Sequence, residues 1–140
     1  MPDKGKIYIT EFDLKRLKEL IKVAEEFGDK RVVRYLEELD EELDRAEAMK
    51  PQEIPNDVIT MNSTFRLRDL DTHQEAVYTL VFPGDADSAS GKISILAPIG
   101  TAVLGYKIGD MIEWEVPAGR KRFKVEQIVY QPEAAGDYHR

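Results

Sequence analysis

The chain has little of the chemistry on which enzymes and metalloproteins depend. It contains no cysteine and only two histidines, His73 and His139. Without cysteine there is no disulfide, no thiolate zinc site and no cysteine nucleophile. The two histidines lie far apart in the sequence, and neither has neighbours of the metal-ligand type. We therefore expect no metal site, no cofactor and no catalytic residue.

Long apolar runs and an excess of basic residues are missing as well. No stretch approaches the roughly 20 apolar residues of a membrane-spanning helix, and residues 1–13 lack the apolar segment of a signal peptide. The formal net charge of −7 disfavours a protein built to coat nucleic acid, because phosphate neutralisation needs surplus lysine and arginine. We expect a cytoplasmic protein that binds no membrane and has no strong direct affinity for nucleic acid.

Helical periodicity dominates the first part of the chain, where apolar residues recur at helical spacing. The first stripe consists of Leu14, Leu17, Leu20, Ile21, Ala24 and Phe27, and the second of Val32, Val33, Leu36, Leu39, Leu43, Ala46 and Met49. Thr10 is placed to cap the first helix, with Asp13 at the third helical position. Gly28 suits the left-handed position at the end of that helix. Because one apolar stripe cannot stay buried alone, the pattern predicts an antiparallel helical hairpin over residues 11–49.

The pattern changes after Pro51 and Pro55, which end the second helix and stiffen the connection. Branched and aromatic residues then alternate with polar ones. The predicted elements are strands at 59–70, 75–82, 111–116 and 120–130, a polar loop at 83–92, a short helix at 99–105 and an extended tail at 131–140. The expected fold class is α+β. We expect a short helical hairpin (1–50), a linker (51–57) and an antiparallel β domain with one short helix (58–140).

The β part carries several short motifs in a fixed order: Y-x-L-V, A-D, a glycine before I-S, P-I-G-x-A-x-L-G, G-D and P-x-G. The residues that form them are Tyr78, Leu80, Val81, Ala86, Asp87, Gly91, Ile93, Ser94, Pro98, Ile99, Gly100, Ala102, Leu104, Gly105, Gly109, Asp110, Pro117 and Gly119. This series closely resembles the C-terminal domain of the Gre family of bacterial transcript-cleavage factors. The opening "IYITEFDLKRL" and the tail "YQPEAAGDYH" resemble the Rnk branch of that family, the regulators of nucleoside diphosphate kinase. The resemblance thus covers nearly the whole chain.

The resemblance implies an N-terminal antiparallel coiled coil joined to an FKBP-like domain. Members of the family bind bacterial RNA polymerase, with the globular domain at the rim of the secondary channel and the coiled coil pointing inward. It implies that Ala97, Pro98, Ile99 and Gly100 belong to the polymerase-binding surface, although the family generally has serine where Ala97 stands. The name of the Rnk branch reports regulation of nucleoside diphosphate kinase and leaves direct or indirect contact open. We expect a monomer.

Acids at the hairpin tip, Glu25, Glu26 and Asp29, are the second set of candidate residues. In the Gre family, tip carboxylates help to hold a catalytic Mg²⁺ in the polymerase, as suits a hard cation with oxygen ligands. Here a first helix of about 16 residues is only about 24 Å long, which is markedly shorter than in Gre factors. We favour the interpretation that these acids form a solvated helix end.

Three further charged groups have a functional and a structural interpretation. Residues 37–47 place seven acids against Arg45, as a solvated face or as a surface that a charged channel would steer. Lys15, Lys18 and Lys22 are expected to pair with neighbouring acids rather than with RNA. The basic segment 120–124 is either an exposed corner or an edge strand protected by charge.

Three functions are compatible with these features. We favour a non-enzymatic regulator that binds RNA polymerase at the secondary channel and competes with Gre factors by steric exclusion. The alternative is a Gre-like cleavage factor that acts through the tip acids. A minor alternative, an FKBP-like prolyl isomerase, rests on fold alone and needs a pocket of convergent aromatic side chains.

Overall fold

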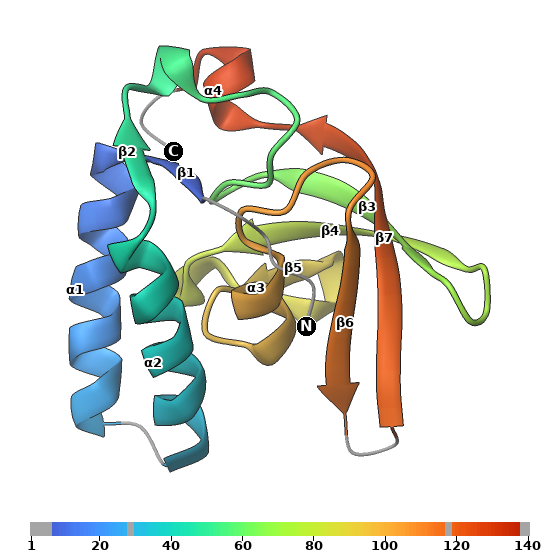
Figure 1. The fold of residues 1–140 in the computed structure, drawn as a ribbon, viewed down its shortest axis with the longest axis horizontal. Coiled ribbons are helices and arrows are strands. Elements are labelled where there is room, and N and C mark those ends of the chain that lie inside the picture. The colour runs from blue at the N-terminus through green and yellow to red at the C-terminus, as the bar shows by residue number, and fades with distance from the viewer. Residues whose placement is uncertain (1–6, 28–29, 117–118, 138–140) are drawn as a thin grey trace.

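The computed structural model describes residues 7–27, 30–116 and 119–137 (Figure 1). Its elements, in chain order, are β1 (Tyr8–Thr10), α1 (Glu11–Phe27), α2 (Lys30–Asp44), β2 (Glu47–Met49), the 3-10 turn η1 (Pro51–Glu53), β3 (Thr64–Asp69), β4 (Glu75–Val81), the turns η2 (Pro83–Asp85) and η3 (Ser88–Ser90), β5 (Lys92–Ser94), α3 (Pro98–Val103), β6 (Met111–Val116), β7 (Gly119–Tyr130) and α4 (Pro132–Ala135). None of the helices among these residues has the length and apolar character needed to cross a bilayer.

A five-stranded sheet forms the second half of the molecule, with the strand order β5-β4-β3-β7-β6. The pairs β3–β4, β3–β7 and β6–β7 are antiparallel, and the helical hairpin lies to one side of the sheet (Figure 1). The α+β class is therefore confirmed. One strand departs from the predicted antiparallel arrangement, because β5, which the sequence did not indicate, pairs with β4 in parallel. The chain between them, residues 82–91, crosses over through the turns η2 and η3 instead of forming a tight hairpin.

The predicted helical hairpin is confirmed, and so is its cap: the Asp13 N–H donates to the Thr10 hydroxyl at 3.0 Å. The extension of the second helix to Met49 is wrong. The N–H groups of Arg45 and Ala46 bond to carbonyls three residues back, which turns the chain out of the helix. The next residues form β2, which pairs in parallel with β1 and closes the base of the hairpin. The predicted left-handed Gly28 lies outside the described residues.

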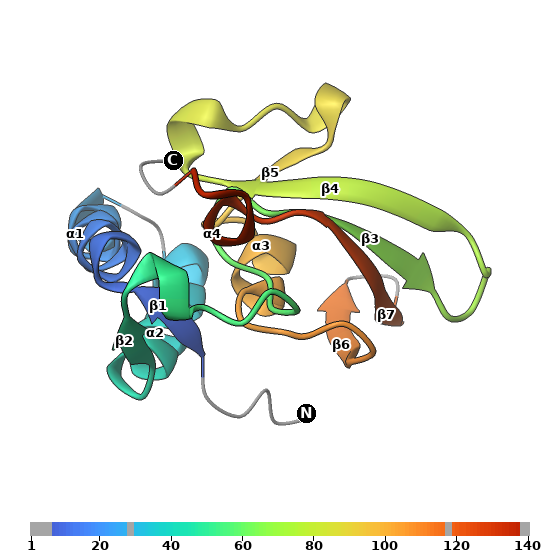
Figure 2. The same ribbon diagram turned by 90° about the horizontal axis from the view of Figure 1, so that it is seen from above.

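One apolar core joins the hairpin to the sheet. The buried members from the hairpin region are Ile7, Ile9, Leu17, Ile21, Leu36, Leu39 and Leu43, and those from the rest of the chain are Ile59, Met61, Phe65, Leu67, Leu80, Ile95, Val103, Leu104, Tyr106, Ile112 and Val125. Helix α3 lies in the middle, between α2 and the sheet (Figure 2). The hairpin therefore packs along the β part and is not an isolated arm.

The C-terminal tail is a docked element, so the expectation of an extended tail is wrong. The Gln131 amide donates to the carbonyls of Pro55 and Val58, both at 2.8 Å. Glu133 is buried and accepts a hydrogen bond of 2.6 Å from the Thr60 hydroxyl. These bonds fasten helix α4 to the segment that links the hairpin to the sheet, because the polar side chains find partners inside the fold rather than in water.

Two strand predictions also need correction. The first strand begins at Thr64 rather than at residue 59, because Asn62 adopts a left-handed conformation with φ of 66° and the Thr60 N–H bonds to the Ser63 hydroxyl. The basic segment 120–124 pairs with β6 throughout, but β7 pairs with β3 only from Phe123 onward, so only the start of the segment has a free edge. Three of its cations pair with acids: Arg120 with Glu113, Lys121 with Asp69, and Arg122 with Asp71 at 3.0 Å.

Candidate functional site

The candidate segment 97–100 forms the start of helix α3. Ala97 is the N-cap residue and makes no side-chain capping bond. Ala97 and Ile99 are half-buried, whereas Gly100 is buried. The Pro98 side chain lies outside the described residues. The segment is therefore a surface corner in which only part of each described side chain meets solvent.

Packing explains the two glycines of this corner. A Cβ atom at Gly100 would lie 2.0 Å from the carbonyl oxygen of Ser94, so no larger residue fits there. Gly105 has a φ of 88°, which favours glycine, and a Cβ there would lie 2.8 Å from the Ile7 side chain. The core side chains of Val103 and Leu104 are fully buried between them. The corner is thus held rigidly against the core and against β1.

Two of the three predicted tip acids lie in the last turn of α1, at the far end of the hairpin from the β1–β2 pair (Figure 1). Glu25 and Glu26 are exposed in the last turn of α1, and Asp29 lies outside the described residues. Helix α1 has 17 residues, which corresponds to a length of about 26 Å. Among the described residues, no group of three or more potential ligands could hold a metal ion.

Lys18 pairs with acids, as the sequence predicts for the lysines of the first helix. Its ammonium group lies 2.8 Å from an Asp40 carboxylate oxygen and also contacts Asp44. Burial alone would lower the pKa of Lys18, but the hydrogen bonds and charges of these two carboxylates raise it above its usual value. The pair ties α1 to α2, whereas Lys15 and Lys22 remain exposed.

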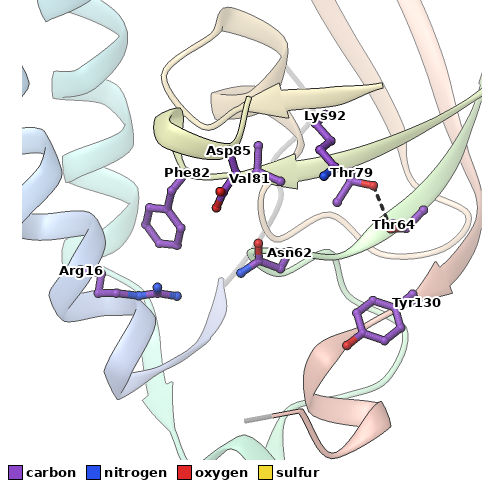
Figure 3. A pocket seen from close by; sticks show the side chains of 9 residues that line it. All are labelled: Arg16, Asn62, Thr64, Thr79, Val81, Phe82, Asp85, Lys92 and Tyr130. Carbon is purple, nitrogen blue, oxygen red and sulfur yellow. Dashed lines mark hydrogen bonds between the residues drawn. The ribbon is translucent and has the colours of Figure 1, made fainter. Parts of the chain in front are cut away.

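The structure reveals a pocket that no motif indicates. It has a volume of about 580 Å³ and is lined by Arg16, Asn62, Thr64, Thr79, Val81, Phe82, Asp85, Lys92 and Tyr130 (Figure 3). These residues come from α1, from the turn before β3, and from strands β3, β4 and β7, the turn η2 and β5. Their side chains converge only after folding, so sequence reasoning missed them; their wide spacing leaves no local signal.

Arg16 forms one wall of the pocket and connects it to the hairpin. Its guanidinium carbon lies 4.3 Å from the Phe12 ring centroid and 4.2 Å from that of Phe82. The same group donates to the Asp13 carboxylate at 2.7 Å. Stacking on two rings and the ion pair hold the guanidinium between α1 and the end of β4.

Two buried carboxyl groups lie behind this wall. Burial raises the pKa of Asp13, although the hydrogen bond and charge of Arg16 oppose the shift. Burial also raises the pKa of Glu133; the hydrogen bond from Thr60 opposes that shift, and the nearby Asp13 charge adds to it. The junction of α1, α4 and the sheet is therefore a place where the fold disfavours negative charge.

Comparison with known proteins agrees with this architecture. Residues 54–130 match the model of the C-terminal domain of the transcription elongation factors GreA/GreB, and residues 6–48 match the model of the Rnk N-terminus. An α+β chain of this kind, with a helical hairpin packed on a GreA/GreB domain, belongs to the GreA/GreB family. This confirms the family resemblance found in the sequence.

Particular relatives narrow the assignment. The chain is 46% identical over 101 residues to the regulator of nucleoside diphosphate kinase from Escherichia coli, covering 71% of this chain and 74% of the relative. It is 33% identical over 135 residues to the transcription elongation factor GreA of Clostridium botulinum, covering 86% and 84%. The structure of a GreA/GreB transcription elongation factor from Nitrosomonas europaea matches with a TM-score of 0.77 and 41% identity, covering 89% of this chain and all of that one. The protein is thus a Gre-like factor similar to the regulators of nucleoside diphosphate kinase.

Proposed function

We propose that this protein binds bacterial RNA polymerase at the rim of the secondary channel and competes there with Gre factors, without a cleavage activity of its own. The observation that carries the proposal is the combination of a GreA/GreB domain with a hairpin of only 17 and 15 residues. Because this protein shares its C-terminal domain with Gre factors, it would dock on the polymerase through the same surface. Its short hairpin would then block the channel entrance without reaching the deep end of the channel. Steric exclusion then regulates the polymerase with no bond made or broken by this protein.

The corner formed by residues 97–100 is the proposed docking surface. Its backbone is fixed, because Gly100 packs against Ser94 and the Thr101 hydroxyl donates to the Ile95 carbonyl at 2.7 Å. A rigid surface loses little conformational entropy on binding. Ala97 and Ile99, each half-buried, are the residues that would supply the apolar contact.

Purified core RNA polymerase loaded with fluorescent GreA tests the competition directly. We expect the unlabelled protein to displace GreA at micromolar concentration, whereas failure to displace it would refute the proposal. Ala97→Glu, which adds charge to the docking surface, should weaken displacement about tenfold or more, as is typical of a central interface residue. Ala89→Glu is the matched control, because Ala89 is exposed in the turn η3. If both variants displaced GreA equally well, Ala97 would not be part of the docking surface.

Stalled elongation complexes test the absence of cleavage. We expect no release of short 3′ RNA fragments, because about 26 Å of helix α1 places Glu25 and Glu26 well short of a channel's deep end. Fragment release that disappears in Glu26→Ala would instead support the alternative, a cleavage factor that acts through its tip acids. Asp29, the third predicted tip acid, would be tested in the same way.

The proposal also covers the oligomeric state, the location in the cell and the binding partners. We expect a monomer that acts in the cytoplasm and has no strong direct affinity for nucleic acid, with its N-terminal part (1–50) entering the channel and its C-terminal part (58–140) docking. A link to nucleoside diphosphate kinase would then be indirect, through transcription. Sedimentation at micromolar concentration tests the monomer, and pull-down with the purified kinase tests for direct contact.

A further inference from the structure

We propose that the pocket on the outer face of the sheet binds a small phosphorylated molecule of nucleotide size. The proposal is independent of polymerase docking, because the pocket lining includes none of the residues of the corner 97–100. It rests on the size of the hollow, on the cations and hydroxyls that converge in it, and on the position of one carboxylate.

The size of the hollow favours a metabolite over a simple ion. About 580 Å³ lies within the range of roughly 300–1,000 Å³ that is common for small-molecule sites. The lining comes from several elements that the core and the sheet hold in place, so the hollow exists before a ligand arrives. Figure 3 shows its side chains pointing toward a common space from both the hairpin side and the sheet side.

Lys92 is the cation best placed to hold a phosphate. It lies on β5, and its side chain is exposed and points into the pocket (Figure 3). None of the ion pairs found among the described residues involves it. Beside it, the hydroxyl oxygens of Thr64 and Thr79 lie 2.9 Å apart. One hydroxyl hydrogen is used in that bond, so the second hydroxyl keeps a hydrogen that can be donated to a ligand oxygen. A lysine with hydroxyl donors at its side suits phosphate oxygens.

Asn62 adds a polar side chain at the floor of the pocket. Its backbone has a φ of 66°, a conformation that favours glycine and asparagine. The side chain of Asn62 points toward the open space in Figure 3. The amide offers both donors and an acceptor, which allows it to meet either a phosphate oxygen or a ligand hydroxyl.

Charges of both signs in the lining decide the class of ligand. Arg16 makes its wall positive, but its ion pair with Asp13 offsets part of that charge, so Lys92 should carry most of the affinity. Asp85 would repel a phosphate placed next to it, yet it can accept hydrogen bonds from sugar hydroxyls, as acidic residues do for ribose in dinucleotide sites. A ligand with a phosphate at one end and vicinal hydroxyls further along satisfies both, and a ribonucleotide has this chemistry.

Such a ligand would contact the hairpin and the sheet at once. Arg16 belongs to α1, whereas Lys92 belongs to β5, at the far edge of the sheet order. A molecule held between them stabilises the packed arrangement of hairpin and sheet, because any ligand that binds only the folded arrangement shifts the equilibrium toward it. The stability of the packing between hairpin and sheet would then depend on the concentration of the ligand.

Isothermal titration of the full chain with AMP, adenosine and inorganic phosphate tests the proposal. We expect saturable binding of AMP, weaker binding of phosphate and none of adenosine, with amide shifts confined to the pocket in NMR spectra. Lys92→Gln should raise the dissociation constant for AMP about tenfold, the effect of losing one charge-assisted bond. Lys124→Gln is the matched control, because Lys124 lies on β7 outside the pocket.

Three outcomes of these titrations would overturn the proposal, and two further variants test it. Binding of adenosine as tight as that of AMP, equal effects of the two lysine variants, or no saturation by AMP at about 10 mM would each overturn it. Asp85→Asn should tighten phosphate binding, because it removes a like charge, and weaken AMP binding. Asn62→Gly keeps the left-handed backbone and removes the amide, so it should weaken AMP without unfolding the chain. None of these results bears on displacement of GreA, so the two proposals fail separately.

Discussion

Replacement of Gly100 by alanine should destabilise the fold strongly, although it adds only one methyl group. An ideal Cβ at this position lies 2.0 Å from the carbonyl oxygen of Ser94, 2.9 Å from its carbonyl carbon and 3.1 Å from the Cα atom of Ile95. All three neighbours are backbone atoms, so no side-chain rotation relieves the overlap. Either helix α3 or the chain that follows β5 has to move.

The neighbouring backbone is held on several sides, which sets the size of the effect. The Ser94 carbonyl accepts from the Ala97 N–H at 3.0 Å, the Ile95 N–H donates to Val81 at 2.9 Å, and the Ile95 carbonyl accepts from Thr101 at 2.7 Å. Overpacking alone typically costs about 1–3 kcal/mol, and each hydrogen bond that is lost adds about 1 kcal/mol. The higher helix propensity of alanine returns less than about 1 kcal/mol. We expect a net loss of about 3 kcal/mol.

Urea unfolding followed by circular dichroism measures this loss. At about 2.1 cal/mol/K per residue, a chain of 140 residues has an unfolding entropy of about 0.3 kcal/mol/K, so the same loss lowers the Tm by about 10 °C. Gly84→Ala is the matched control, because a Cβ at Gly84 meets no atom within 4 Å. If Gly100→Ala and Gly84→Ala both stayed within about 0.5 kcal/mol of the parent protein, the packing account of this corner would be wrong.

The remaining predictions concern single side chains. Ala97→Ser should raise the free energy of unfolding by about 0.5–1 kcal/mol, since a hydroxyl at this N-cap can bond to the free amides of α3; an unchanged urea midpoint would contradict this. Burial raises the pKa of Glu133, so its ionisation destabilises the fold as pH rises from the usual value of 4.5 toward the higher folded-state pKa. Glu133→Gln, which can still accept from Thr60, should therefore become more stable relative to the parent protein as the pH rises above 4.5, as measured by urea midpoints. Lys18→Gln should cost about 0.2–1 kcal/mol at low salt and almost nothing in 1 M NaCl, because it removes a partly exposed ion pair with Asp40.

Sequence patterns predicted the elements that bury one continuous apolar face. The helices α1 and α2 follow from apolar residues at helical spacing, and β4, β6 and β7 follow from alternation along the chain. The strands β1 and β2 were missed because each has three residues and pairs with a partner nearly forty positions away. Met49 fits the helical spacing of α2, yet its backbone pairs with Thr10. Tertiary pairing thus overrides local spacing where an element is too short to have a pattern of its own.

The candidate sites differ in how far they could be predicted from the sequence. The corner 97–100 and the tip acids Glu25, Glu26 and Asp29 could be named from the sequence because the resemblance to the Gre family assigns roles to these short segments, and those roles still await the polymerase experiments. The pocket could not be found in this way, because its lining residues, among them Arg16 and Tyr130, are far apart in the sequence and line one hollow only after folding. The tail was misjudged for a similar reason: Glu133 looks like a solvent-exposed acid until the structure shows its bond to Thr60.

The packing of the hairpin bears directly on how the protein would act in a channel. A hairpin on a loose linker could extend its reach by swinging outward, and a short helix would then not exclude contact with a distant site. Here Leu17, Leu36 and Leu43 are buried in the same core as the sheet, and Ile7 fills the space above Gly105. Swinging the hairpin away would expose the parts of these side chains that face the rest of the core, at up to about 1.5–3 kcal/mol for each. The reach of the tip is therefore set by helix length and not by hinge motion, which favours exclusion of longer factors over chemistry at the tip.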